Sequence, residues 1–210
     1  MILLFGLGNN ETKYLNTKHN IGRLVVEKLS SEWGLSFVEN QNCHVAKNSK
    51  DMWLVYSDGY MNNSGEPLSK LIKYYKIQPN NCTIIIIQDD SDQNSGGVKL
   101  IAGGGTAGHN GIISCYQHLA SLGFEQKDIW RLKIGIRPLG NKLKSENFVL
   151  SANTREDSET VAVVAKEIKS NINFLMEKNW NRLQTKLNRK PKKLEDKTES
   201  VVFDNVSKVA

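Results

Sequence analysis

The sequence feature that most constrains the fold is a run of four isoleucines at residues 84–87. Side chains of a β-strand alternate between its two faces, so this run places apolar groups on both faces. Such a strand belongs in a sheet that is covered on both sides, as parallel sheets are. Residues 2–7 form another apolar segment, and we expect it to be the first core strand.

Helical patterns alternate with the predicted strands along the chain. We expect strands at residues 2–7, 43–48, 51–57, 82–88, 97–102 and 129–136, and helices at 20–33, after Gly65, at 109–122 and from 156 to about 190. Apolar residues recur at helical spacing in the first helix, whereas they alternate strictly in the last strand. This order predicts an α/β fold with a mostly parallel or mixed sheet.

The net charge of +6 and the pI near 9.1 favour a polyanionic partner. Basic side chains gather near the C-terminus, with seven basic and two acidic residues from Arg182 to Lys197. This block could hold a phosphate backbone, but after Pro191 a solvated, flexible tail explains the composition equally well. No apolar run is long enough to cross a bilayer, and the N-terminus lacks the pattern of a secretory signal, so we expect no membrane association.

The three cysteines are an odd number without the spacing of metal ligands. They indicate buried thiols in a reducing compartment. Cys115 is a rival candidate for a nucleophile, because it lies near His109 and His118 in the sequence. However, nothing around Cys115 has the features that stabilise a thiolate.

Polar and glycine residues concentrate in five segments that follow or link the predicted elements. These are residues 6–9, 17–20, 60–65, 88–92 and 103–111. His19 follows the first strand, and Asp89 follows the strand at 82–88. If the two strands are parallel neighbours, these side chains meet at the carboxyl edge of the sheet. A carboxylate that fixes one imidazole nitrogen leaves the other free to take a proton from water.

Amides rather than acids surround this predicted pair, namely Asn9, Asn62 and Asn110. Neutral amides can donate to a developing oxyanion and can also recognise a peptide group. A dinucleotide site is disfavoured, because Glu11 stands where the third glycine of that fingerprint would be. The glycine-rich stretch lacks the Lys-Ser/Thr pair of a phosphate-binding NTPase loop, which disfavours nucleotide hydrolysis.

Taken together, the motifs resemble the bacterial-type peptidyl-tRNA hydrolase family. The matching text is Gly-Leu-Gly-Asn at 6–9 with Tyr14, Thr-Lys-His-Asn at 17–20, Tyr-Met-Asn-Asn-Ser-Gly at 60–65, Asp-Asp-Ser-Asp at 89–92, the glycines at 103–105 with Gly-His-Asn-Gly at 108–111, and Arg-Leu-Lys-Ile-Gly-Ile at 131–136. The resemblance covers about residues 1–190. It implies a single three-layer α/β domain, with a mixed twisted β-sheet flanked by helices, that needs no metal or cofactor.

The resemblance also implies a function and a role for each site residue. The reaction is hydrolysis of the ester bond of peptidyl-tRNA, which releases the peptide and recycles the tRNA. His19 would activate water, Asp89 would orient His19, and Asn9 would distinguish N-blocked from free aminoacyl-tRNA. The other implied residues are Tyr14, Tyr60, Asn62 and Asn110 at the peptidyl-adenosine end, His109 in the same cleft, and Lys99 and Lys133 as a clamp for tRNA phosphate.

Four departures from the family pattern concern loop shape and tRNA binding. Asn10 replaces a frequent proline, and Gln88 replaces a histidine. Ile101 occupies the place of a clamp lysine, and Lys133 that of an arginine, which keeps the charge but loses the bidentate fork. We therefore expect the catalytic residues to be intact. We expect tRNA binding to be weaker or to involve other residues.

Several alternatives remain open at this stage. The chain could be a non-catalytic RNA-binding protein on the same scaffold, a hydrolase that uses Cys115, or a structural α/β domain. We expect a cytoplasmic monomer, with a mitochondrial location as the alternative. Residues 1–190 would form the catalytic domain and residues 191–210 a basic C-terminal tail.

Overall fold

The computed structural model of the chain describes residues 1–138, 140, 141 and 145–190, and its strands form one mixed sheet. The strand order is β2-β3-β4-β1-β5-β7-β6. The strands are β1 (Ile2–Gly6), β2 (Val38–Asn40), β3 (Cys43–Ser49), β4 (Met52–Ser57), β5 (Thr83–Asn94), β6 (Val98–Ala102) and β7 (Trp130–Arg137). The central pairs β4–β1, β1–β5 and β5–β7 are parallel, whereas β2–β3, β3–β4 and β6–β7 are antiparallel.

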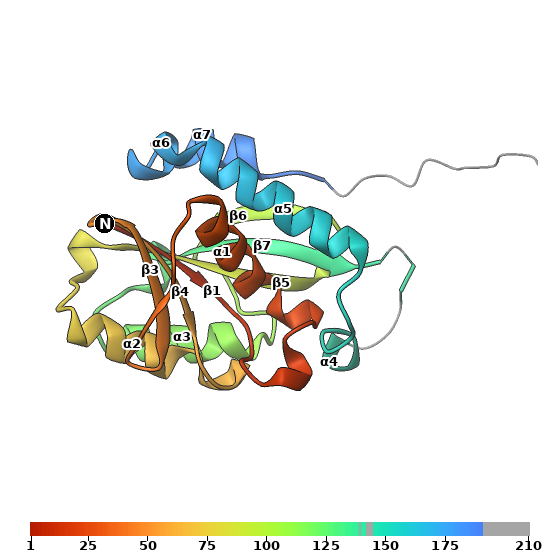
Figure 1. The fold of residues 1–210 in the computed structure, drawn as a ribbon, viewed down its shortest axis with the longest axis horizontal. Coiled ribbons are helices and arrows are strands. Elements are labelled where there is room, and N and C mark those ends of the chain that lie inside the picture. Colours follow the sequence, from red (N-terminus) through yellow and green to blue (C-terminus); the bar gives the residue numbers. More distant parts are fainter. Residues whose placement is uncertain (139, 142–144, 191–210) are drawn as a thin grey trace, which may run out of the picture.

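Helices cover both faces of this sheet, so the molecule has three layers (Figure 1). The helices are α1 (Ile21–Glu32), α2 (Gly65–Tyr74), α3 (Asn110–Ala120), α4 (Ser145–Phe148), α5 (Arg155–Ser170), α6 (Ile172–Met176) and α7 (Trp180–Leu187). Ile2 and Leu4 of β1 pack into the core beneath α1 and α5–α7, whereas Leu3 and Phe5 pack into the core beneath α2 and α3. The expected three-layer α/β fold is thus confirmed. None of the described helices is both long and apolar enough to cross a bilayer.

Two of the predicted boundaries were wrong. The strand expected to end at residue 88 continues to Asn94, because β5 keeps pairing with β7 after its last partner in β1. The helical pattern from residue 156 to about 190 forms three helices, because the chain turns at Asn171 and again at Lys178, whose φ is 55°. The predicted tail at 191–210 lies outside the described residues.

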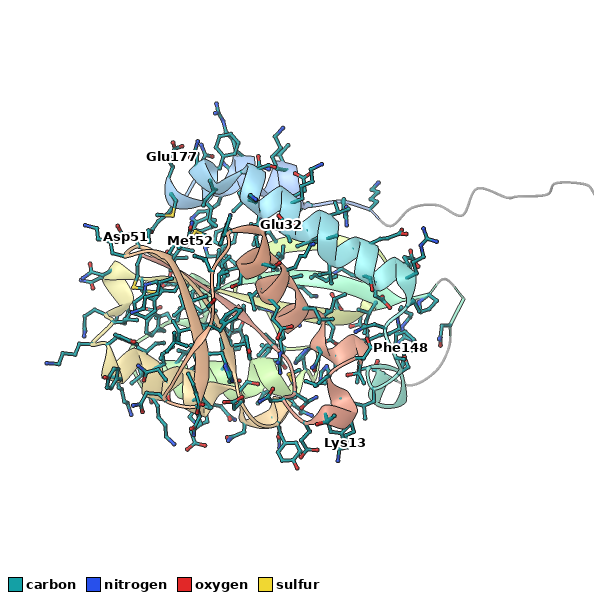
Figure 2. The ribbon with its side chains drawn as sticks, viewed as in Figure 1. Lys13, Glu32, Asp51, Met52, Phe148 and Glu177 are labelled. Carbon is teal, nitrogen blue, oxygen red and sulfur yellow. The ribbon has the colours of Figure 1, made fainter. Side chains whose placement is uncertain are left out.

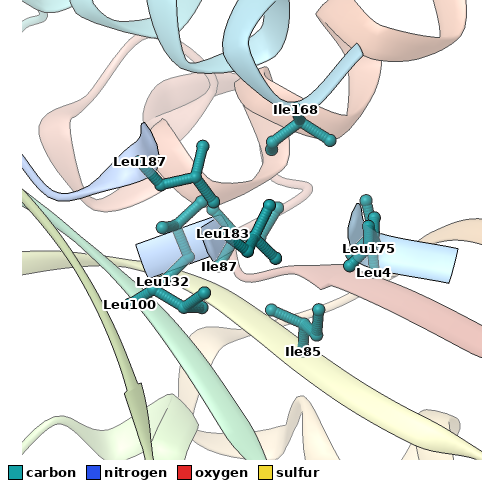
Figure 3. A pocket seen from close by; sticks show the side chains of 9 residues that line it. All are labelled: Leu4, Ile85, Ile87, Leu100, Leu132, Ile168, Leu175, Leu183 and Leu187. Carbon is teal, nitrogen blue, oxygen red and sulfur yellow. The ribbon is translucent and has the colours of Figure 1, made fainter. Parts of the chain in front are cut away.

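The core between the sheet and α5–α7 contains a small apolar cavity of about 10 Å³ (Figure 3). Its lining is formed by Leu4, Ile85, Ile87, Leu100, Leu132, Ile168, Leu175, Leu183 and Leu187. The volume is at the lower limit for one water, and the lining offers no polar partner. The cavity is therefore a packing gap and not a binding site.

Candidate active site

The strand order brings the two predicted catalytic residues to one edge of the sheet. Gly6, the last residue of β1, pairs with Ile87 of β5, so β5 runs past the end of its neighbour. Asp89 stands just beyond that point, within β5 and 2% exposed. His19 lies in a short 3-10 helix, Lys18–Asn20, that leads directly into α1. The predicted meeting of these residues at the carboxyl edge of parallel strands is confirmed.

Two imidazoles share one carboxylate oxygen at this edge. The Oδ1 atom of Asp89 lies 2.8 Å from Nδ1 of His19 and 3.0 Å from Nε2 of His109. Burial alone would raise the pKa of Asp89, but the charges and hydrogen bonds of His19 and His109 outweigh burial and hold that pKa well below its usual range. Asp89 is therefore a carboxylate at neutral pH. Nε2 of His19 has no hydrogen-bond partner in the described part of the chain, so it is available to a substrate or water.

Asn9 is held in one orientation by three hydrogen bonds. Its backbone N–H donates to Oδ1 of Asn20 (2.7 Å), and its backbone carbonyl accepts from Nδ2 of Asn20 (2.8 Å). Its side-chain Oδ1 accepts from the backbone N–H of Met61 (2.7 Å). Because the oxygen is occupied, the Nδ2 group of Asn9 remains as a donor with no partner among the described residues.

The segment that carries His19 is anchored to the residues just before α5 and to its first turn. The backbone N–H groups of Lys18 and His19 donate to the carbonyls of Ser151 (3.0 Å) and Val149 (2.8 Å). The ammonium group of Lys18 is buried and pairs with the carboxylate of Asp157, which also closes the capping box of α5. The ring of Phe148, labelled in Figure 2, lies 5.4 Å from this ammonium nitrogen.

Arg131 connects the two loops that supply Asp89 and His109. Its side chain is fully buried, and Nε donates to Oε1 of Gln88, the residue before Asp89 (2.8 Å). Its Nη1 donates to the carbonyls of Gly105 (2.7 Å) and Gly104 (3.1 Å) in the glycine-rich loop. Carbonyls of the glycine-rich loop thus bind this guanidinium.

Three of the four residues predicted to contact the peptidyl-adenosine end are exposed. Tyr60 is 53% exposed, and its hydroxyl bonds to the carboxylate of Glu11, which lowers the pKa of Glu11. Tyr14 is half-buried, and its carbonyl accepts from Thr17. Two more of these residues are exposed: Asn62, in the 3-10 helix Met61–Asn63 beside Asn9, and Asn110, at the start of α3. None of these four predicted contact residues is hydrogen-bonded to His19 or Asp89 within the described residues.

The predicted clamp residues lie opposite each other on β6 and β7. Lys99 pairs with Lys133 in the antiparallel register, and Ile101 pairs with Arg131. Lys133 forms an ion pair, because its ammonium nitrogen lies 2.6 Å from Oδ2 of Asp90. Lys99 is exposed and has no ion-pair partner among the described residues. The positive charge available to a phosphate at this position thus comes mainly from Lys99.

The cysteines do not have the environment of a nucleophile. All three are free and buried. Burial raises the pKa of Cys43 to about 12 and that of Cys82 to about 11, and it also raises the pKa of the fully buried Cys115 well above its usual range. This result argues against a hydrolase that uses Cys115, since the thiolate is the reactive form.

Comparison with known proteins agrees with this geometry. The family model described as peptidyl-tRNA hydrolase matches residues 3–196. The chain belongs to the peptidyl-tRNA hydrolase family. It is 41% identical to the peptidyl-tRNA hydrolase of Francisella tularensis subsp. tularensis strain FSC 198 over 154 residues, which cover 71% of this chain and 77% of that protein. It is 32% identical to that of Aromatoleum aromaticum over 192 residues, which cover 90% and 94%.

Solved structures support the same conclusion for the fold. The crystal structure of peptidyl-tRNA hydrolase from Acinetobacter baumannii matches with a TM-score of 0.76 and 26% identity, over 90% of this chain and 95% of that chain. A complex of a peptidyl-tRNA hydrolase with N-propanol matches with a TM-score of 0.77 and 27% identity, over 91% and 97%. The mixed sheet of this peptidyl-tRNA hydrolase family member is therefore that of its relatives.

Three supporting residues were not assigned a role from the sequence. Lys18 and Arg131 stand within quoted motifs, but a charged residue in a loop or on a strand ordinarily indicates a solvated position. Asp157 could have been found from the pattern Thr-x-x-Asp at 154–157, which resembles a capping box before an apolar helix. Nothing in the pattern indicated that Asp157 would also bind Lys18.

Proposed function

We propose that this chain hydrolyses the ester bond between the peptide and the 3′-terminal ribose of peptidyl-tRNA. In this mechanism Nε2 of His19 removes a proton from water, and the water oxygen attacks the ester carbonyl. The tetrahedral intermediate then breaks its bond to the ribose oxygen, which takes the proton back from His19. The products are a peptide carboxylate and a tRNA with a free hydroxyl group.

The observation that carries the proposal is the 2.8 Å contact between Nδ1 of His19 and Oδ1 of Asp89. With Asp89 ionised, Nδ1 carries the proton and Nε2 keeps a lone pair for a water molecule. General-base action of this kind contributes about 10²–10⁴ in rate. The mechanism needs no covalent intermediate, in agreement with the burial of Cys115.

The remaining predicted residues have roles in substrate recognition in this proposal. The Nδ2 group of Asn9 would donate to the carbonyl oxygen of the group that blocks the amino end or to the developing oxyanion, which its fixed orientation supports. Tyr14, Tyr60, Asn62 and Asn110 would contact the peptidyl-adenosine end from the rim of the cleft. Lys99 would bind a tRNA phosphate, with Lys133 contributing less because Asp90 neutralises it.

A release assay tests the proposal. Purified protein should cleave N-acetyl-aminoacyl-tRNA and spare free aminoacyl-tRNA. His19→Ala should lower kcat by about 10²–10⁴, while His44→Ala should leave it unchanged. His44 is a matched control, because it also pairs with a carboxylate, 2.9 Å from Oδ1 of Asp58, and is not hydrogen-bonded to His19 or Asp89 among the described residues.

The same assay separates the proposed hydrolase from a non-catalytic RNA-binding protein. Binding of N-acetyl-aminoacyl-tRNA without any release would favour the binding protein, and normal turnover in a folded His19→Ala variant would refute the assigned base. Since ribosomes make the substrate, the enzyme would work where translation occurs, in the cytoplasm or, as the alternative, in mitochondria. We propose a monomer, which light scattering during gel filtration would test.

A further inference from the structure

The catalytic edge holds more ligand atoms for a metal than a general base requires. His19, Asp89 and His109 each offer one ligand atom, and these atoms all lie within 4.8 Å of one another. Two imidazole nitrogens point at the same oxygen, at 2.8 Å and 3.0 Å. Two histidines and one carboxylate form a ligand set that suits Zn²⁺ and related transition metals.

A second observation concerns the polar atoms of this cluster that remain unpaired. Nδ1 of His109 is buried without a hydrogen-bond partner, and the side chain is only 8% exposed. No described residue donates a hydrogen bond to Oδ2 of Asp89. The described residues therefore leave Oδ2 of Asp89 without a hydrogen bond that would compete with a cation.

We propose that His19, Asp89 and His109 bind one Zn²⁺ ion, and that this ion inhibits the enzyme. In a tetrahedral site with ligand bonds of 2.0–2.1 Å, neighbouring ligand atoms are about 3.3 Å apart. The two contacts to Oδ1 of Asp89 would therefore have to lengthen by a few tenths of an ångström, and the ligand nitrogens of His19 and His109, which lie within 4.8 Å of one another, would have to reach the same spacing. The fourth position of the ion would be left to water from the cleft.

Inhibition follows from where the imidazole proton must go. In the metal-free enzyme, Nδ1 of His19 holds the proton and Nε2 has the lone pair. A metal on Nδ1 requires the lone pair at that atom, so the proton of the neutral ring moves to Nε2. His19 then has no free lone pair and cannot remove a proton from water. This inhibitory effect rests on the proposed function, whereas the metal site itself does not.

Co²⁺ provides a test of the site that needs no substrate. The full-length protein, first treated with a chelator, should bind one Co²⁺ per chain and show the visible absorption of a tetrahedral or five-coordinate ion. Zn²⁺ should displace Co²⁺, and a competing chromophoric chelator gives its affinity. His109→Asn should weaken Zn²⁺ binding by at least about tenfold, since one ligand is removed. If His109→Asn and the unmodified chain bind Zn²⁺ equally, the site is refuted.

The matched control for this test is His44→Asn. His44 has one carboxylate partner and no second histidine, so this variant should keep both the Co²⁺ spectrum and the Zn²⁺ affinity. Cys43, Cys82 and Cys115 are buried and should not compete for the ion. Equal loss of the spectrum in His44→Asn and His109→Asn would place the metal elsewhere and refute the proposal.

Activity completes the test. Zn²⁺ should abolish cleavage of N-acetyl-aminoacyl-tRNA by the unmodified chain, and a chelator should restore it. Turnover that persists or rises in the zinc-loaded enzyme would refute inhibition, because the ion would then be harmless or would itself activate water. A chain that binds Co²⁺ but cleaves no substrate after chelation would refute the proposed function and leave the metal site standing.

Discussion

Replacement of Arg131 by lysine tests whether one buried guanidinium holds both catalytic loops in place. Lysine keeps the charge but has a single donor group in place of the planar fork. It cannot reach Gln88 and the carbonyls of Gly104 and Gly105 together, as Arg131 does at 2.8, 3.1 and 2.7 Å. At least one buried acceptor then lacks its donor.

The magnitude follows from the hydrogen bonds that a lysine side chain cannot replace. A hydrogen bond to a charged group contributes about 1.5–3 kcal/mol, and an unsatisfied buried group costs about 1–3 kcal/mol. Arg131→Lys should therefore lower the free energy of unfolding by about 2–5 kcal/mol. If Asp89 or His109 shifts by on the order of 1 Å as a result, kcat should fall about 10²-fold. KM should change little, because the exposed rim and Lys99 are untouched.

Urea unfolding, monitored by circular dichroism, measures the change in stability. Initial rates of cleavage of N-acetyl-aminoacyl-tRNA measure the changes in kcat and KM. Arg155→Lys is the matched control, since Arg155 is 93% exposed and pairs with Glu159 at the surface. This control should change stability by less than about 0.5 kcal/mol. If Arg131→Lys matches the control in urea midpoint and kcat, Arg131 does not position the site. A change confined to KM would also contradict the argument.

Three further predictions concern Asp89, the cysteine thiols and the apolar core. Asp89→Asn should lower kcat by about 10²–10⁴, because the amide no longer holds a proton on Nδ1 of His19. A release assay that shows a normal kcat would contradict this prediction. Iodoacetamide at pH 8 should leave activity intact. A pKa of about 12 leaves about 10⁻⁴ of Cys43 as thiolate, and Cys115 is also buried and protonated. Stoichiometric labelling with inactivation would contradict this prediction. Leu183→Ala should reduce the free energy of unfolding by about 2–5 kcal/mol without changing kcat per folded molecule. The control is Leu150→Ala, which should have little effect on urea unfolding because Leu150 is 45% exposed.

The sequence predicts the centre of the site because only local rules are needed there. Apolar runs on both faces identify β1 and β5 as central parallel strands, and neighbouring parallel strands end at the same edge. That geometry places His19 beside Asp89. The length of β5 was not predictable in the same way, since its final residues are held by pairing with β7 and not by their own composition.

Long-range contacts explain the other features that the sequence did not predict. Alternation in β7 correctly identifies Leu132, Ile134 and Ile136 as core, but it implies that Arg131 faces solvent. The glycine-rich loop covers that side of the strand, and its path cannot be inferred from its glycines. The turn at Lys178 contains neither glycine nor proline, so the helical pattern gave no sign that it would break there.

The anchoring of the His19 segment has a consequence for the order of events during synthesis. Lys18 and its partner Asp157 are separated by 139 positions, and Val149 accepts the backbone hydrogen bond of His19. Chains emerge from the ribosome N-terminus first, and contacts of large sequence separation form late. A nascent chain that already contains His19, Asp89 and His109 therefore still lacks the contacts that hold the His19 segment in place. Hydrolytic activity should appear only after the start of α5 has left the exit tunnel.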